Sequence, residues 1–503
     1  MGDTRTQRCT SVIATSALLF LLPLATYWRT IFHRYGIRDD YSILREVQEE
    51  PGKVLRVCAM IGRPLYGWLL ELSGRAAGGI DGLCWLRFAS AACLGVLGSV
   101  VFLLLKQQGW RPPQAALLAA TLTMLPSAQV LASWAICWPQ ALASLLGAAA
   151  FALSDWEEHR TPGVLPRGSG WILAVCVMAV ATLTYQPSGL FYAVLVAASL
   201  VARRHDSFRS TLVGLARHLG VMGAGLGAAF VFMKLLFATG MFQPSPRLSF
   251  ELHWLNKAAW VMTHALPHTL ALLVLDDTRG GTPAAFRLMV GLTLVTITVG
   301  LVLEGRRAGL AGCGRWLVGL AALSAAAYCV SFLAHERWPT YRTLYALTGV
   351  WSVFFVASLV NIGACWPAGG QKVATALLAC LAAASVVLAH RQSFELFALP
   401  QGRELALMEE GASRAVLAER PRIFVITVLQ DDTSAPRRYL DEFGSVSIDA
   451  EWMAKEVLKH VMKERFPEVR DVSGGYRFAT GPRAPEPGDY DILIDLRRLR
   501  QGT

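Results

Sequence analysis

Residues 84–105 read CWLRFASAACLGVLGSVVFLLL, an apolar run interrupted by a single arginine near its start. An α-helix needs about 20 predominantly apolar residues to cross the hydrocarbon of a bilayer, so this stretch indicates a transmembrane helix. The rest of the chain repeats the pattern. Of its 503 residues 54% are hydrophobic and 17% charged, and the mean hydropathy is +0.42. These values are typical of a mainly α, polytopic membrane protein.

We expect about eleven transmembrane helices, with the short run at 190–202 the weakest. The expected spans are residues 11–31, 84–105, 115–131, 136–153, 171–183, 190–202, 219–238, 284–303, 316–333, 344–360 and 373–389. No small-residue cleavage site follows the first run, which favours a retained signal anchor. The apolar segment 257–275 contains Pro267, which favours a partly buried helix at the membrane interface. If that segment did span the membrane, the C-terminal tail would lie on the other side.

Basic residues mark the loops expected on the cytoplasmic side. They gather in four loops, at residues 106–111, 160–167, 203–217 and 306–315. The loops at 133–139 and 185–189 contain neither lysine nor arginine. This alternation places the N-terminus in the cytoplasm, and an odd number of spans leaves loop 32–83 and everything after His390 outside. The net charge of +11 comes from the chain before His390, so these loops explain it and no nucleic-acid partner is expected.

The composition changes after His390 to that of a soluble domain. We therefore divide the chain into a transmembrane domain, residues 1–390, and a small α/β extracytoplasmic domain, residues 391–503. In the second domain we expect helices at 394–417 and 449–466 and strands at 422–429, 476–480 and 491–496. The ten cysteines all lie at or before Cys380, so disulfides cannot stabilise this domain.

Loop 32–83 is too long and too charged to be a simple connector. It carries Asp39 and Asp40, followed by an expected helix at 42–60. A carboxylate at the outer membrane face can remove a proton from an incoming hydroxyl group, so both aspartates are candidate catalytic residues. The structural alternative is that Asp40 or Ser42 caps the helix that follows.

Further candidate binding residues lie in loops expected on the same face. Arg63 and Tyr66 follow the expected helix within the first loop, Tyr185 and Gln186 end a span, and Arg337, Tyr341 and Arg342 lie in a late loop. Guanidinium groups can bind a phosphate through two hydrogen bonds, and tyrosine and glutamine can hold sugar hydroxyls. The alternatives are that the arginines are interfacial anchors and that the aromatic residues belong to the interfacial belt.

Other motifs do not support a cofactor. His264, His268, Asp276 and Asp277 offer metal ligands within one loop, but Pro267 disturbs their helical spacing. The glycines at 223, 225 and 227 lie in an apolar helix without the preceding strand that a nucleotide-binding fingerprint requires, and they indicate close helix packing instead. We therefore name no metal ligands and expect no soluble nucleotide donor; a divalent metal is left open as a cofactor, although no motif supports it.

The order of these motifs resembles one known group of enzymes. One span, an outer loop with Asp39-Asp40, then Gly62-Arg63-Pro64-Leu65, later Tyr185-Gln186 and a late loop with arginine and tyrosine, are similar to the bacterial type II, serotype-converting glucosyltransferases. That family belongs to the GT-C superfamily of polytopic membrane glycosyltransferases. The resemblance covers about the first 390 residues.

The resemblance implies a GT-C-like hexosyltransferase in the bacterial cytoplasmic (inner) membrane. Its donor would be a polyprenyl-phosphate sugar, usually glucose, and its acceptor a lipid-linked or polymeric glycan of the cell envelope, such as the O-antigen of lipopolysaccharide. Asp39 and Asp40 would supply the base, and Arg63, Arg337 and Arg342 would meet the lipid phosphate. Direct displacement would invert the sugar. The D-x-D triplet of metal-using GT-C members is absent from loop 32–83.

Two other functions fit a polytopic chain of this kind. A transporter or flippase of lipid-linked sugars would bury ionisable residues in the middle of its spans or show inverted repeats, whereas Arg87 and Lys234 lie near span ends. A membrane-anchored sensor or scaffold would work through its tail alone and would not need Asp39.

Overall fold

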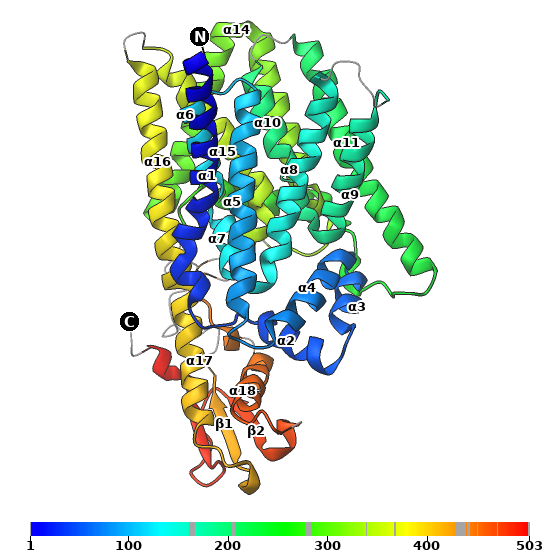
Figure 1. Cartoon of the computed structure of the whole chain (residues 1–503), viewed down its shortest axis with the longest axis vertical. Coiled ribbons are helices and arrows are strands. Elements are labelled where there is room, and N and C mark those ends of the chain that lie inside the picture. The colour runs from blue at the N-terminus through cyan, green and yellow to red at the C-terminus, as the bar shows by residue number, and fades with distance from the viewer. Residues whose placement is uncertain are drawn as a thin grey trace.

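The computed structural model describes residues 2–159, 166–203, 207–276, 283–338, 340–366, 369–427, 439, 443–449, 451–469 and 471–500. Helices form a bundle, with a small sheet domain at one end and the N-terminus at the other (Figure 1). The expected mainly α fold with a small C-terminal α/β part is therefore confirmed.

The long helices of the bundle match the expected spans. They are α1 (Gly2–Phe32), α5 (Leu83–Gln107), α8 (Trp138–His159), α9 (Ser169–Gly189), α11 (Phe208–Ala238), α14 (Ala284–Leu333), α15 (Tyr341–Gly363) and α16 (Gly370–Ser393). Within the described residues eight helices are long and apolar enough to cross a membrane, or nine if one bent pair counts as a span.

Helix α14 contains two of the expected spans. Its 50 residues would reach about 75 Å as one straight helix, more than twice the hydrocarbon thickness of about 30 Å. Gly309 interrupts it with φ 66° and ψ −164°, a conformation almost restricted to glycine. Across the resulting turn Arg315 donates to Glu304 at 2.9 Å. The two arms correspond to residues 284–303 and 316–333.

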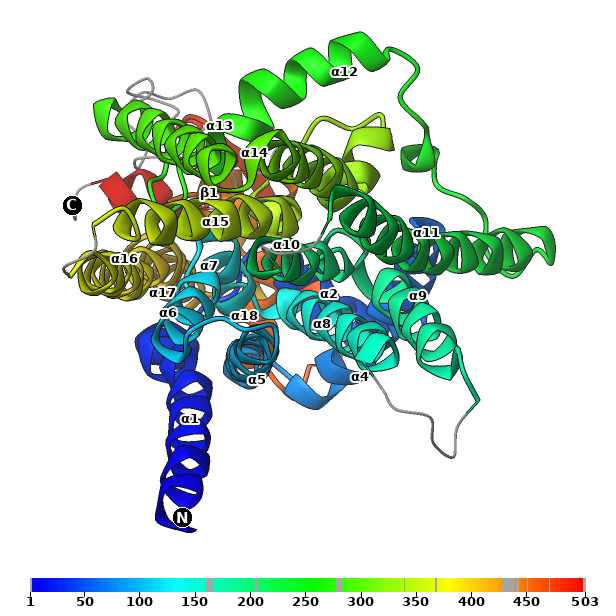
Figure 2. The ribbon, with the colours of Figure 1, turned by 90° about the horizontal axis from the view of Figure 1, so that it is seen from above.

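Two expected spans are less regular than their sequences suggested. The run at 115–131 folds as α6 (Pro112–Leu122) and α7 (Pro126–Ser133), which bend by 55° relative to each other. Pro126 lacks the backbone N–H that would continue the first helix. The weak span at 190–202 is α10 (Tyr192–Ala202), only 11 residues long and almost wholly buried. It lies among α8, α14 and α15 in the view along the bundle (Figure 2).

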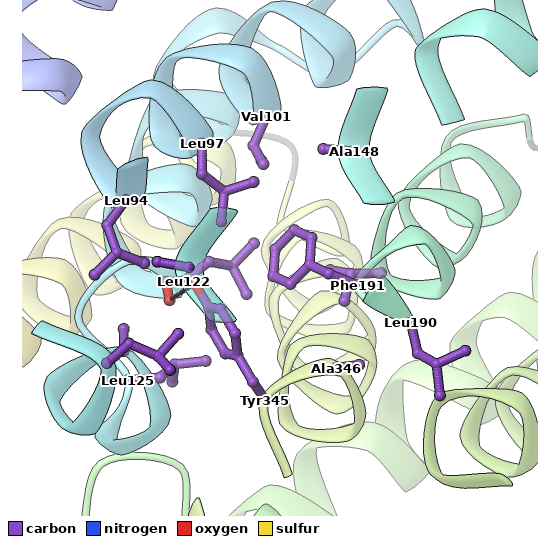
Figure 3. Packing of buried hydrophobic residues seen from close by; sticks show 14 of the residues in the cluster. Leu94, Leu97, Val101, Leu122, Leu125, Ala148, Leu190, Phe191, Tyr345 and Ala346 are labelled. Carbon is purple, nitrogen blue, oxygen red and sulfur yellow. Dashed lines mark hydrogen bonds between the residues drawn. The ribbon is translucent and has the colours of Figure 1, made fainter. Parts of the chain in front are cut away.

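The core of the bundle lies where α5, α10 and α15 meet (Figure 3). Leu94 and Leu97 of α5 face Phe191 and Tyr345 in this packing. The Tyr345 hydroxyl donates to the carbonyl oxygen of Leu122 at 3.1 Å, at the bend that ends α6. In a membrane, close packing and such buried hydrogen bonds hold helices together, because lipid is as apolar as the side chains.

The segment at 257–275 is divided into short pieces. It contains most of α12 (Trp254–Trp260), a π-helical turn (Val261–Ala265) and α13 (Leu266–Leu270). These helices are not among those long and apolar enough to cross a membrane, in agreement with the prediction of a helix that does not span it.

Loop 32–83 folds into three helices at the end of the bundle that carries the sheet domain (Figure 1). They are α2 (Asp39–Glu49), α3 (Lys53–Met60) and α4 (Pro64–Ala77). The single helix expected at 42–60 is wrong, because Pro51 and Gly52 separate α2 from α3. Gly52 adopts φ 82°, a conformation that favours glycine.

The C-terminal part is a three-stranded parallel sheet with helices. Its strands are β1 (Arg422–Ile426), β2 (Arg477–Gly481) and β3 (Ile492–Asp495), in the order β2-β1-β3. Its helices are α17 (Leu399–Ala412) and α18 (Glu451–Arg465). The helical stretch Gly370–Ala412 runs through the boundary expected at residue 390, so α16 continues by way of a π-helical turn (Phe394–Ala398) into α17.

Candidate functional site

The turn between α1 and α2 is held by Arg87 of α5. Its fully buried guanidinium donates to the carbonyl oxygens of Ile31, His33 and Tyr35 at 2.8–3.1 Å. The same group lies 4.0 Å from the centre of the Tyr35 ring. Because hydrogen bonds to a charged group are stronger than those between neutral groups, Arg87 fixes the path of the chain into the acidic pair.

Asp40 is fully buried and holds two backbone amides. One carboxylate oxygen accepts from the N–H of Ile37 at 2.8 Å and the other from the N–H of Ile136 at 3.1 Å. Burial raises the pKa of Asp40 to about 7, although both hydrogen bonds and the charge of Arg87 act in the opposite direction. Asp40 therefore fastens the first loop to the segment before α8 and does not face solvent.

Asp39 is the more accessible carboxylate of the pair. It is half-buried and begins α2, directly after Arg38, whose φ of 39° is unusual for a residue other than glycine. Burial raises the pKa of the nearby Cys58 thiol to about 12, while Arg63 lowers this pKa and Asp39 raises it. The charges of Asp39 and Arg63 therefore both act on this thiol, which belongs to α3 of the first loop.

A break in α9 brings two predicted residues to Arg63. Tyr185 has an extended backbone, φ −156° and ψ 107°, two residues before Pro187, which cannot donate to the preceding turn. Gln186 donates to the carbonyl oxygen of Gly62 at 2.9 Å and accepts from Arg63 Nε at 2.9 Å. The Arg63 guanidinium carbon lies 4.4 Å from the centre of the Tyr185 ring, a cation–π contact.

Tyr66 connects this group to the acidic pair. Its hydroxyl donates to the carbonyl oxygen of Ile136 at 2.9 Å and accepts from Gln140 at 3.3 Å, and its ring centre lies 5.9 Å from that of Tyr185. Asp40 accepts from the N–H of the same Ile136. Ile136, shortly before α8, thus joins the Asp40 carboxylate of the first loop to Tyr66 and, through the contact of their rings, to Tyr185.

Arg342, in the first turn of α15, reaches the same region. Its guanidinium carbon lies 4.5 Å from the Trp134 ring centre, and the Trp134 indole donates to the carbonyl oxygen of Ile37 at 3.0 Å. Burial raises the pKa of Tyr66, and the charge of Arg342 lowers it. We call the seven residues brought together here the site cluster: Asp39, Asp40, Arg63, Tyr66, Tyr185, Gln186 and Arg342.

Two other predicted residues have neighbours outside the site cluster. Arg337 donates to the fully buried Glu251 at 3.2 Å. The buried ring of Tyr341 packs against Phe443 and His268, with ring centres 5.4 and 6.1 Å away. Sequence reasoning did not find the partner of Arg337, because Glu251 lies in another loop and carries no motif.

The site cluster combines cationic and acidic groups at one end of the bundle. Arg63 and Arg342 are half-buried and stack on aromatic faces, which orients a planar group suited to bind phosphate through two hydrogen bonds. A partly accessible carboxylate lies in the same loop as Arg63. Sequence reasoning missed Arg87, Trp134 and Gln140, which hold the cluster together. The signal in the sequence that could have indicated Arg87 and Gln140 is their position as polar residues near the starts of apolar spans.

Groups that could bind a metal lie elsewhere in the described chain. Asp155, Glu158 and His159 approach within 4.8 Å of one another at the far end of α8, but Arg203 forms ion pairs with both acids. His268 lies 3.7 Å from Asp276, and Asp277 is outside the described residues.

No family model matches the sequence, and no curated protein matches it. Among solved structures, the Archaeoglobus fulgidus oligosaccharyltransferase tethered with an acceptor peptide aligns over 94% of this chain and 64% of its own, with 14% identity and a TM-score of 0.44. Its apo form aligns over 94% of this chain and 64% of its own, with 11% identity and a TM-score of 0.46. The oligosaccharyltransferase AglB of that organism was solved in complex with an inhibitory peptide and a dolichol-phosphate. It aligns over 80% of this chain and 58% of its own, with 13% identity and a TM-score of 0.41. This chain spans less than two thirds of the length of each of these structures.

Proposed function

We propose that this chain is a membrane glycosyltransferase that moves a hexose from a polyprenyl phosphate to a cell-envelope glycan. The resemblance to serotype-converting glucosyltransferases favours glucose as the hexose. The observation that carries the proposal is the site cluster itself. Arg63, Arg342 and the acidic pair come from three parts of the sequence, yet one set of aromatic and hydrogen-bond contacts connects them.

The two arginines would hold the phosphate of the donor. Arg63 already has its orientation set by Gln186 and Tyr185, and among the described residues these partners are neutral. Its charge is therefore not compensated by a described carboxylate. The prenyl chain would lie in lipid, and the phosphate would meet the two guanidinium groups where the bundle ends.

Asp39 would act as the base. The acceptor hydroxyl gives its proton to the Asp39 carboxylate while its oxygen forms a bond to the anomeric carbon, and the bond from that carbon to the phosphate oxygen breaks. Polyprenyl phosphate leaves with the bonding electrons, so the phosphate gains one negative charge. Cations placed where charge develops lower the barrier, and one displacement inverts the anomeric centre.

Asp40 would position this base. Its two carboxylate oxygens each accept from one backbone amide, that of Ile37 in the first loop and that of Ile136 shortly before α8. A rigid turn before Asp39 holds the carboxylate at one distance from the phosphate site, and such positioning contributes strongly to enzymatic rates.

We also propose on which side of the membrane each part lies. The N-terminus would lie in the cytoplasm of a bacterium, and the site cluster and the sheet domain outside the inner membrane. Both lie at the same end of the bundle (Figure 1), which supports a site on the side reached by envelope glycans. The acceptor would be a lipid-linked or polymeric glycan.

The test uses the purified full-length protein in lipid nanodiscs with radiolabelled polyprenyl-phosphate glucose and envelope glycan. Asp39→Asn should lower kcat by about 10²- to 10⁴-fold, because it removes the base. Asp489→Asn, at an exposed loop of the sheet domain, is the control and should retain full activity.

A fully active Asp39→Asn protein would refute the assignment of the base. Envelope glycans from cells with and without the gene, compared by mass spectrometry, then identify the sugar. Glycans that differ in amount but carry the same sugars would favour a transporter of lipid-linked sugars.

A further inference from the structure

The acidic turn contacts the C-terminal domain on the side away from the bundle. His460 of α18 is 6% exposed, and its Nε2–H donates to the carbonyl oxygen of Tyr41 at 2.5 Å. The His460 and Tyr41 ring centres are 6.0 Å apart. A residue near the end of the chain thus bonds to the backbone directly after Asp40, 419 positions earlier.

Ser447 of the C-terminal domain makes a second contact with the turn, at Arg38, the residue directly before Asp39 and Asp40. Its hydroxyl oxygen accepts from the N–H of Arg38 at 2.9 Å and donates to Gln401 of α17 at 2.7 Å. The carboxylate of Glu404, also on α17, accepts from the N–H groups of Ser447 and Ile448 at 3.1 and 3.0 Å. Helix α17 therefore fixes Ser447, and Ser447 fixes the amide of Arg38.

The held residue is strained. Arg38 has φ 39° and ψ −108°, a conformation that costs about 1–3 kcal/mol and persists only where the surroundings enforce it. The carbonyl of Tyr41 is held by His460, so the turn is fixed by the C-terminal domain on both sides of Asp39 and Asp40. The bundle holds the same turn from the other side through Arg87 and Trp134.

Ion pairs around these two bonds hold the domain in place. Arg34 pairs with Glu409 of α17 and Glu464 of α18. Arg45 of α2 pairs with Glu456 of α18 at 2.7 Å. The C-terminal domain is thus joined to both ends of the turn and to the helix that follows it.

We propose that the C-terminal domain positions the catalytic turn, with Ser447 and His460 as positioning residues that set the backbone of Arg38 to Tyr41 and thereby the place of the Asp39 carboxylate. This inference rests on the proposed function. It gives the domain a role in the chemical step that does not require it to bind the glycan.

The experiment compares the full-length protein with Ser447→Ala, His460→Ala and the double variant. Ser447→Thr keeps the hydroxyl, and His460→Gln keeps an N–H donor at nearly the same place. Ile494→Val, in the buried core of β3, is the control for a small loss of packing away from the turn. Steady-state kinetics give kcat and the KM for polyprenyl-phosphate glucose, and hydrogen-exchange mass spectrometry follows a peptide that covers residues 37–42.

The alanine variants should lower kcat by about tenfold each, since small displacements of a catalytic group have effects of this size or larger. The KM for the donor should stay within about twofold, because Arg63 and Arg342 are unchanged. Amide exchange at 37–42 should become faster, and the threonine and glutamine variants should restore both readouts. Ile494→Val should change neither.

The proposal is overturned if the double variant keeps the kcat of the wild type, or if its effects equal those of Ile494→Val. A wild-type protein without transferase activity would refute the proposed function instead. Hydrogen exchange then decides the present proposal alone: faster exchange in the alanine variants supports it, and unchanged exchange overturns it.

Discussion

Two arginine sites at opposite ends of the helix bundle differ in their partners. At the end near the N-terminus, Arg315 pairs with Glu304 and Arg203 pairs with Asp155 and Glu158. At the opposite end, the described partners of Arg63 are the amide of Gln186 and the ring of Tyr185. The first arrangement neutralises charge within the protein, and the second orients a cation while its charge stays available. Under the proposed function, the contacts of an arginine, more than its presence in a loop, separate structural cations from those that bind a ligand.

The largest effect on stability should come from the N-terminal end. Glu304→Ala leaves the guanidinium of Arg315 buried without its carboxylate, since both side chains are at most 4% exposed. Breaking a buried pair in this way destabilises by about 3–5 kcal/mol. Thermal unfolding in detergent measures the loss, and transfer activity per folded molecule should be unchanged. Lost activity at normal stability would show that this end also takes part in function.

At the site end Arg63→Ala should act on catalysis instead. Loss of one cation that stabilises developing charge costs about 3 kcal/mol, or about 10²-fold in kcat/KM, with a small change in stability. Arg337→Ala is the matched comparison, because Arg337 already pairs with Glu251. It should lower stability and retain most of the activity. Equal losses of activity in the two variants would contradict the distinction between them.

Asp40 gives a prediction for pH. Its pKa is raised from 3.8 to about 7 by burial, so the folded protein binds this proton more tightly than the unfolded chain. Its contribution to stability is complete below about pH 4 and is lost as the pH rises through 7, at about 1.4 kcal/mol per unit. The stability of the wild type relative to Asp40→Asn should therefore fall between pH 4 and 7 and level off above. Equilibrium unfolding at several pH values measures it, and a constant difference would contradict the burial of this carboxylate.

The smallest effect should come from the partly exposed pair of Lys459 and Glu49, 2.8 Å apart. Lys459→Ala should cost less than about 1 kcal/mol, and added salt should reduce the difference further. Thermal unfolding at two salt concentrations measures this. A loss comparable to that of Glu304→Ala would mean that the contact between α2 and α18 acts as a buried interface.

Much of the fold could be predicted, because a membrane span is a local property of about 20 apolar residues. The eleven expected spans all correspond to helices or helix pairs among the described residues, but α10, with 11 residues, is not among the helices long enough to cross a membrane. The expected strands of the tail are also present, since alternating apolar residues near glycine and proline are a local signal too. A single helix was expected at 42–60, although Pro51 and Gly52 are local signals for the break that separates α2 from α3.

The site was predicted only in part, because its contacts join distant parts of the sequence. The side chains of Arg63 and Gln186 meet although 123 positions separate them. Both were named from the sequence, Arg63 for its place in the first outer loop and Gln186 for its place at the end of a span. The pairing of Arg337 with Glu251 and the bond from His460 to Tyr41 have no local signal. The catalytic roles of Asp39 and Asp40 stay predictions. The burial of Asp40 became visible only in three dimensions, since neighbouring aspartates have the same sequence context.

The helical stretch from Gly370 to Ala412, which includes the π-helical turn at Phe394–Ala398, links the bundle directly to the sheet domain. Its 43 residues measure about 65 Å, of which a bilayer takes up about 30 Å. The remainder, about 35 Å, reaches beyond the bilayer to the sheet domain, so helix rather than a loop joins the two parts. Under the proposed function, an acceptor glycan would therefore have to bring its hydroxyl to the level where the bundle ends, and glycans held farther from the bilayer would not be modified.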